Sequence, residues 1–322
     1  MNNSNSVMVT GASGFIGRVL CKELLLKHYK LSILLRGHDT LASIDSNIVS
    51  NSEIFSYDND NDFSMLLMDV DIVIHLAARV HMVHETENDP LKVYREANVE
   101  LTKKLALAAV ANKVKRFIFI SSLLVNDGNF GSTPLLETDI PSPQTPYGIS
   151  KLEAEEILRE ISAQYGLEVV IIRPPLVYGP HVKGNFLSLL RLVNVGLPFL
   201  PLGALNNKRS FVSVNNLVDL LIACIEHPKA SNEVFFVSDD EDVSVTNLIK
   251  LLAKHLDKPR PLLPISVGLL EKIGKLLGKL DSVKKLSMPL QVNITKVKNL
   301  LGWRPVQELS DGLQEMVDWF RE

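Results

Sequence analysis

The stretch "VMVTGASGFIGRVL", Val7 to Leu20, contains the turn that decides the fold. Its apolar beginning predicts a strand over 6–10, and the amphipathic pattern that follows predicts a helix over 14–27. Three glycines stand at a spacing of three and three: Gly11, Gly14 and Gly17. Small residues at such a turn let the backbone approach a pyrophosphate, whose charge is attracted to the free N–H groups at the helix start.

The glycine spacing alone leaves a second interpretation open. Gly-x-x-Gly-x-x-Gly differs from the common Gly-x-Gly-x-x-Gly fingerprint, so a tight strand-to-helix turn without a ligand is the alternative. Because the motif lies in a strand–turn–helix unit at the start of the chain, we favour a dinucleotide site.

Strands and helices alternate through the first half of the chain. The strands are expected over 6–10, 31–35, 53–57, 71–77, 116–121 and 168–173, and the longer helices over 14–27, 90–112 and 145–166. Val- and Ile-rich strands separated by helices indicate a parallel sheet that is buried on both faces. The predicted fold class is therefore α/β, a Rossmann-type doubly wound parallel sheet with a smaller C-terminal lid.

The pattern changes after residue 180. We predict a dinucleotide-binding domain over 1–180, to which 209–227 returns, and a lid that makes up most of 181–322, including a short strand at 233–238. The segment 266–286 is amphipathic and basic. A helix packed on the lid is the favoured interpretation of this segment, and a helix at a membrane surface is the alternative.

Composition excludes several classes of function. The 322 residues are 46% hydrophobic and have a net charge of −3, so no general attraction to nucleic acid is expected. The sequence shows no signal peptide and no run near the roughly 20 apolar residues of a membrane span. Cys21 and Cys224 lie in apolar helical contexts and are expected to be reduced core thiols, which fits a cytoplasmic protein.

The end of the second strand bears on the choice of cofactor. A carboxylate there would bind the ribose hydroxyls of NAD, but the sequence "LLRGHD" places Leu35 and Arg36 at this point and Asp39 later. Arg36 could pair with a 2′-phosphate, which favours NADP(H), with NAD(H) as the alternative. An arginine that stacks on adenine or faces solvent is the other interpretation.

"YGISK" supplies Tyr147 and Lys151, which a spacing of four places on one helix face. A nearby ammonium and an oxidised nicotinamide would both favour the phenolate, and a pKa drop of about three units corresponds to about 4 kcal/mol. Ser121 and Ser122 follow the fifth strand, at the sheet edge where such folds bind ligands. A hydroxyl there could share a proton with Tyr147, and a strand-end cap is the alternative role.

Together these motifs resemble the extended short-chain dehydrogenase/reductases of the nucleotide-sugar epimerase/dehydratase group. The matching segments are "TGASGFIG" (10–17), "HLAA" (75–78), Asn98 in "ANVELT", "ISS" (120–122), "YGISK" (147–151), "RPPLVYGP" (173–180) and "RSFVSVNNLVDL" (209–220). The resemblance implies that Tyr147, Lys151 and Ser122 are catalytic, with Ser122 preferred to Ser121 by alignment. It also implies a homodimer formed through helices near 91–112 and 145–164.

The resemblance assigns the remaining site residues. The cofactor would contact Gly11, Ser13, Gly14, Phe15, Ile16, Gly17, Arg36, Asp58, Leu76, Ala77, Ala78, Lys151, Pro174 and Val177. A UDP-sugar would contact Ser122, Tyr147, Asn185 and Arg209. No metal is expected, and His81, His84 and Glu85 are assigned to the lining of the sugar cleft because no further ligand cluster accompanies them.

Departures from the family pattern reduce the number of reactions that the protein could catalyse. The 4,6-dehydratases carry Thr-Asp-Glu where Ser122, Leu123 and Leu124 stand here, so acid–base chemistry of that kind is not expected. The family's Val-Tyr-Gly is replaced by Val125-Asn126-Asp127, which alters the sugar contact.

The finer likeness is to bacterial surface-polysaccharide enzymes, such as those of O-antigen synthesis, that reduce UDP-4-keto-6-deoxy-N-acetylhexosamines. A NAD(P)H-dependent 4-reductase is therefore the first hypothesis. A UDP-hexose or UDP-N-acetylhexosamine 4-epimerase with retained NAD is the alternative. A nucleotide-sensing binding protein on the same fold is the third.

Overall fold

A seven-stranded parallel sheet forms the centre of the protein. The computed structural model describes residues 5–37, 44–57, 63–80, 89–195 and 199–322. The strand order is β10-β6-β5-β4-β1-β2-β3, and every neighbouring pair is parallel. The strands are β1 (Ser6–Thr10), β2 (Lys30–Arg36), β3 (Glu53–Tyr57), β4 (Ile72–His75), β5 (Arg116–Ile120), β6 (Glu168–Arg173) and β10 (Val234–Phe236). The order reverses between β1 and β4, which is where doubly wound sheets bind ligands.

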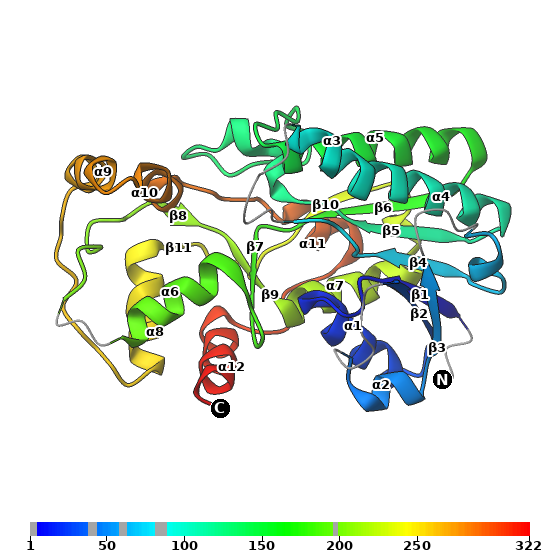
Figure 1. The fold of residues 1–322 in the computed structure, drawn as a ribbon, viewed down its shortest axis with the longest axis horizontal. Coiled ribbons are helices and arrows are strands. Elements are labelled where there is room, and N and C mark those ends of the chain that lie inside the picture. Colours follow the sequence, from blue (N-terminus) through cyan, green and yellow to red (C-terminus); the bar gives the residue numbers. More distant parts are fainter. Residues whose placement is uncertain (1–4, 38–43, 58–62, 81–88, 196–198) are drawn as a thin grey trace.

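Helices cover both faces of this sheet (Figure 1). One face carries α1 (Phe15–Leu26), α2 (Ser46–Ser50) and α7 (Val214–Glu226), and the other carries α3 (Pro90–Tyr94), α4 (Leu101–Ala111) and α5 (Pro146–Tyr165). Neighbouring residues of a strand face opposite layers: Val9 joins the core beneath α1 and α7, whereas Met8 joins the core beneath α4 and α5. The predicted doubly wound α/β fold is thus confirmed.

The helix expected over 90–112 is interrupted. A π-helical turn at Arg95–Glu100 separates α3 from α4. The 3₁₀ segments of the described residues are Met65–Leu67, Pro228–Ala230 and Leu123–Asn129, the last of which is kinked at Asn126. Among the described residues no helix has the length and apolar character to cross a bilayer.

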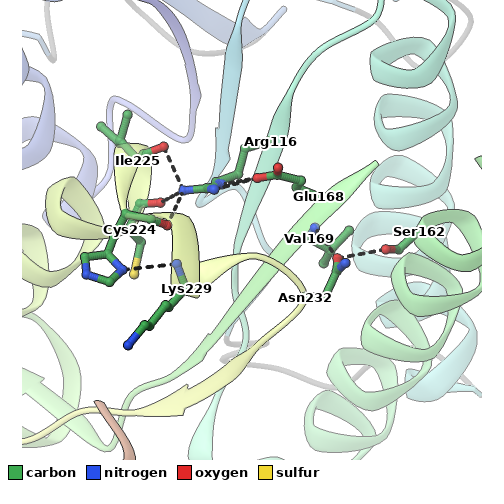
Figure 2. Close-up of polar contacts among 9 residues, drawn as sticks. Arg116, Ser162, Glu168, Val169, Cys224, Ile225, Lys229 and Asn232 are labelled. Carbon is green, nitrogen blue, oxygen red and sulfur yellow. Dashed lines mark hydrogen bonds and ion pairs between the residues drawn. The ribbon is translucent and has the colours of Figure 1, made fainter. Parts of the chain in front are cut away.

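The short strand expected at 233–238 belongs to the main sheet, although it lies within the segment predicted to be mostly lid. The strand is β10, which pairs with β6 in the register Val234 to Ile171 and extends the main sheet. Asn232, at φ 61°, holds the turn before it: its Oδ1 accepts from Ser162 Oγ (2.9 Å) and from the Val169 backbone N–H (3.0 Å) (Figure 2). These side-chain contacts across the fold direct the strand back to the sheet.

Arg116 joins the start of β5 to the end of α7 (Figure 2). Its Nη1 donates to the backbone carbonyls of Cys224, Ile225 and His227 at 2.7, 2.9 and 3.0 Å. Its Nη2 pairs with Glu168 Oε2 at 2.5 Å. A cation at the last carbonyls of a helix complements their partial negative charge, so this contact secures α7 against the sheet.

The remaining elements form a separate core around Tyr178, Phe186 and Leu313. They are β7 (Leu176–Tyr178) paired with β9 (Phe211–Ser213), β8 (Lys208–Arg209) paired with β11 (Val243–Ser244), and the helices α6 (Gly184–Asn194), α8 (Val245–His255) and α12 (Leu309–Arg321). α11 (Thr295–Leu301) lies near β10.

The helix expected over 266–286 is two helices, α9 (Val267–Leu276) and α10 (Leu280–Ser287), which lie beside each other at one end of the molecule (Figure 1). Gly278 between them has a φ of 66°, a backbone conformation that glycine adopts without strain. The chain therefore reverses at this residue.

Candidate active site

The glycine turn packs closely on the end of β4. At Gly11, with φ 73°, an added Cβ would lie 2.8 Å from the Ala77 backbone N, and at Gly17 it would lie 2.2 Å from the Gly11 carbonyl oxygen. Gly14 is the N-cap of α1 and supplies no side-chain hydrogen bond, and the first turn contains no acidic residue. Within the described residues no side chain caps the start of α1, which suits a pyrophosphate. Ser13, Phe15 and Ile16 lie half-buried beside them.

His75, at the end of β4, is a core histidine. Its Nδ1 and Nε2 lie 2.6 and 3.0 Å from the hydroxyl oxygens of Thr10 and Thr102. Burial lowers the pKa of His75 to about 3, helped by the charge of Lys151. The ring is therefore neutral at physiological pH and supports the strand end structurally.

Thr10 also positions the segment that follows His75. Its backbone carbonyl accepts from the Leu76 N–H, and its Oγ1 accepts from the Ala77 N–H at 3.1 Å. Leu76, Ala77 and Ala78 lie half-buried at the β1–β4 edge. This is the position in which the sequence predicted contacts with the cofactor.

The other predicted cofactor residues lie on separate elements. Arg36 is exposed at the end of β2, opposite Tyr57 of β3. Pro174 is buried after β6, where its carbonyl accepts from the Leu123 N–H at 2.9 Å. Val177 is half-buried on β7. Asp58 lies outside the described residues, as do Asp39, His81, His84 and Glu85.

Tyr147, Lys151 and Ser122 come together at the carboxyl edge of the sheet. The Ser122 hydroxyl lies close enough to the Tyr147 phenol to act on its pKa, and it accepts from the Leu124 N–H at 3.2 Å. Lys151 is one helical turn further along α5, is 1% exposed, and its Nζ lies 3.9 Å from the ring centroid of Phe119. Thr145 caps α5 by accepting from the Gly148 N–H, which starts the helix immediately before Tyr147.

Ser121, the other candidate, points elsewhere. Its hydroxyl donates to Glu155 Oε1 at 2.5 Å. The two neighbouring serines thus face opposite ways, as alternating strand residues do, and of the two only Ser122 acts on the pKa of the phenol.

The expected lowering of the Tyr147 pKa by Lys151 does not occur in the protein without its cofactor. Burial raises the pKa of Tyr147 above its ordinary value, with Tyr94 contributing in the same direction and the hydrogen bond from Ser122 opposing it. Burial also lowers the pKa of Lys151 to about 7, against the attraction of Glu155. Since removal from water outweighs the local charges, a phenolate here requires a further positive charge close to the ring.

Tyr94 and Asn98 were not assigned roles by sequence reasoning. The Tyr94 ring meets Tyr147 edge-on with centroids 6.0 Å apart. Asn98 Oδ1 accepts from the Arg79 N–H at 2.8 Å, while its Nδ2 donates to Ser150 Oγ, which in turn donates to the Tyr147 carbonyl at 2.8 Å. The π-helical turn therefore connects the end of β4 to the first turn of α5.

A buried ion network beneath Lys151 was also missed. Glu155 is 0% exposed and accepts from both Nε and Nη2 of Arg173, at 2.8 and 2.5 Å, and from Arg159 at 3.0 Å. Arg173 Nη1 donates to Asn126 Oδ1 at 3.1 Å, whereas the buried Nδ2 of Asn126 has no hydrogen-bond partner among the described residues. The spacing of four between Lys151 and Glu155 is a signal that could have identified the carboxylate.

The two residues predicted to hold a nucleotide diphosphate lie in the C-terminal region. Asn185 is exposed in the first turn of α6. Arg209, on β8, donates from Nη1 to the Lys285 carbonyl at 2.6 Å, and burial lowers its pKa. Within the described residues no hydrogen bond joins Asn185 to Arg209, so their common role remains a prediction.

A cleft of about 520 Å³ opens on the outer side of the glycine turn. Ser13, Phe15 and Arg18 line it from one side, and Lys183 and Arg191 of the α6 region line it from the other. Neither Tyr147 nor Lys151 borders it. The described residues contain no group of three or more His, Cys, Asp or Glu side chains that could hold a metal ion.

The fold, the uncapped glycine turn and the Ser–Tyr–Lys cluster define a dinucleotide-dependent enzyme of the short-chain dehydrogenase type. The sequence matches the NAD dependent epimerase/dehydratase family over residues 7–238, and the chain belongs to that family. It is an NAD-dependent enzyme that modifies nucleotide sugars.

Three known proteins illustrate the likeness. A UDP-glucose 4-epimerase of Vibrio cholerae is 44% identical over 318 residues, which cover 98% of this chain and 95% of the relative. An N-acetyl-alpha-D-glucosaminyl-diphospho-ditrans,octacis-undecaprenol 4-epimerase of Escherichia coli O157:H7 is 28% identical, with 98% and 95% covered. The crystal structure of UDP-glucuronic acid 4-epimerase from Bacillus cereus, in complex with UDP-glucuronic acid and NAD, superposes with a TM-score of 0.78 at 26% identity, covering 98% of this chain and 99% of that chain.

Proposed function

We propose that the protein is a 4-epimerase of a UDP-hexose or UDP-N-acetylhexosamine that keeps NAD bound between turnovers. The observation that carries the chemistry is the closeness of the Ser122 hydroxyl to the half-buried Tyr147, which lies one turn from the buried Lys151. The choice of a 4-epimerase over the 4-reductase expected first is supported by the relatives, since a UDP-glucose 4-epimerase matches almost the whole chain.

The chain's own residues would transfer protons to and from the sugar and would hold the sugar and the cofactor in place. Tyr147 would take the proton of the sugar's 4-hydroxyl and later return it, and Ser122 would hydrogen-bond the same oxygen. Lys151 would hold the nicotinamide ribose. When bound, the nicotinamide accepts and returns a hydride, and the positive charge of its oxidised ring favours the phenolate that burial alone disfavours.

Substrate orientation would depend on the lid. The 4-keto sugar must rotate between the two hydride transfers so that its other face meets the nicotinamide. The sugar therefore cannot be held as tightly as the diphosphate. Arg209, with its guanidinium pairing two phosphate oxygens, would hold the diphosphate, and Asn185 would assist it.

One observation keeps the 4-reductase as a second candidate. Arg36 stands at the end of β2, where a carboxylate would bind the ribose of NAD. A guanidinium there suits the 2′-phosphate of NADP(H), and a reductase consumes NADPH and exchanges its cofactor.

The two candidates differ in redox balance, which gives the test. The protein is incubated with NAD and UDP-N-acetylglucosamine or UDP-glucose, and the galacto epimer is followed by chromatography. In parallel, it is mixed with NADPH and a UDP-4-keto-6-deoxy-N-acetylhexosamine, and the absorbance of the reduced nicotinamide is followed. Interconversion without net redox supports the epimerase, whereas stoichiometric loss of NADPH without interconversion replaces it with the reductase.

A further inference from the structure

An apolar stripe lies exposed on the outer side of α9. Leu269, Ile273 and Leu276, at spacings of four and three, share one face of the helix and are 48%, 41% and 87% exposed. Leu277, which directly follows the helix, is 65% exposed. Four large apolar side chains in one continuous patch are unlike the scattered apolar residues of an ordinary surface.

The inner side of α9 packs against the rest of the protein. Leu270 and Gly274 are buried there, and an added Cβ on Gly274 would lie 2.8 Å from Val283 Cγ2 of α10. The helix therefore already packs on the body through a different face, and the exposed stripe is not the face that contacts the core. Among the residues that the structure describes, nothing covers it.

The hairpin that carries the stripe is rich in basic residues. Residues 266–288 contain two acidic residues, Glu271 and Asp281, and five lysines: Lys272, Lys275, Lys279, Lys284 and Lys285. None of these lysines forms an ion pair with a carboxylate in the described part of the chain. The hairpin is thus net positive on a protein whose net charge is −3.

The position of the hairpin leaves the stripe accessible to a large flat partner. α9 and α10 lie at the end of the molecule away from α4 and β4 (Figure 1). The hairpin is held to the body beside the predicted diphosphate residue, because the Lys285 carbonyl accepts from Arg209 and the Leu286 and Met288 carbonyls accept from Asn207 Nδ2.

We propose that the α9–α10 hairpin docks the protein on an anionic lipid bilayer, with the leucine stripe in the interface and the lysines at the headgroups. An apolar face flanked by lysines is the pattern that binds such surfaces, because burial of apolar area and attraction to anionic lipid add. A second copy of the chain is the less suitable occupant, since pairing two hairpins would bring two sets of unpaired lysines together.

Vesicle binding tests the proposal with the full chain. Sedimentation with phosphatidylglycerol-containing vesicles is compared with sedimentation with pure phosphatidylcholine vesicles. We expect binding to the anionic vesicles that weakens with added salt, and a loss of about tenfold or more in Leu276→Ser/Leu277→Ser. The matched control, Leu26→Ser/Ile140→Ser, removes two equally exposed apolar side chains elsewhere and should leave binding unchanged.

Two further measurements distinguish the outcomes. Turnover of soluble UDP-sugar by Leu276→Ser/Leu277→Ser should equal that of the unmodified protein, which separates docking from catalysis. Lys272→Gln/Lys275→Gln should lower binding to anionic vesicles and its dependence on salt. The proposal is overturned if the unmodified protein does not sediment with anionic vesicles, if the control loses binding equally, or if the leucine variant changes the oligomeric state in solution.

Discussion

Lys151 and Glu155 lie one turn apart on the buried face of α5, and they are 1% and 0% exposed to solvent. Glu155 forms its ion pairs with Arg173 and Arg159, and the ammonium of Lys151 rests on the Phe119 ring. The carboxylate thus stabilises the lysine's charge from a distance, and burial still lowers the pKa of Lys151 to about 7. The cluster is therefore arranged for chemistry at a cost in stability.

Replacing Lys151 by methionine should stabilise the protein while removing its activity. The lysine pKa is lowered from 10.5 to about 7, so its charging opposes folding fully below pH 7, and this opposition disappears as the pH rises through 10.5. At pH 7, urea unfolding of the cofactor-free protein should show a gain of about 1 to 4 kcal/mol. Lys103→Met, at an exposed position of α4, serves as the control. If the methionine variant were less stable than the unmodified protein, burial of the Lys151 charge would not be destabilising.

Removing the phenol oxygen should stop turnover without affecting the cofactor. Tyr147→Phe is expected to lower kcat by about a hundredfold or more, because proton exchange with the sugar oxygen is lost. Binding of NAD, measured by titration calorimetry, should stay the same. Tyr165→Phe removes the hydroxyl of an exposed tyrosine on the same helix and should retain full activity. Near-normal kcat in Tyr147→Phe would exclude the phenol from the mechanism.

His75 should make the protein sensitive to acid. Because its pKa is lowered from 6.5 to about 3, the unfolded chain binds a proton that the folded protein does not. The stabilisation is fully present above pH 6.5 and is lost toward pH 3, by up to about 5 kcal/mol. In His75→Asn, the free energy of unfolding should fall less steeply over this range. His181→Asn, an exposed position with φ 67°, should keep the steep profile, and equal slopes for all three proteins would refute the assignment.

The glycine turn should not tolerate a methyl group. An added Cβ at Gly17 would lie 2.2 Å from the Gly11 carbonyl oxygen and 2.7 Å from Ala12 Cα, both backbone atoms. Gly17→Ala is expected to lower the free energy of unfolding by about 2 kcal/mol and to weaken NAD binding. Gly268→Ala meets nothing within 4 Å and lies in α9, so it should be neutral or slightly stabilising. Thermal unfolding of both variants, with and without NAD, provides the comparison.

Local patterns in the sequence determined the first half of the fold and the centre of the site. The Val- and Ile-rich strands from β1 to β6, the glycine turn and the Tyr147–Lys151 spacing follow from periodicities of two and 3.6 residues, which depend only on neighbouring positions. The preference for Ser122 over Ser121 came from family resemblance, and in the structure the Ser121 hydroxyl is bound to Glu155 while Ser122 acts on the pKa of the phenol.

Tertiary structure alone decided the features that join distant segments. Strand β10 has three residues, too few for periodicity to assign it to a sheet, and the contacts of Asn232 with Ser162 and Val169 direct it to β6. The pKa values of Tyr147 and Lys151 depend on burial, which outweighs the charges that the sequence makes visible. The exposed stripe on α9 appears only once packing shows which side of an amphipathic helix the body covers, because periodicity identifies an apolar face but not its partner.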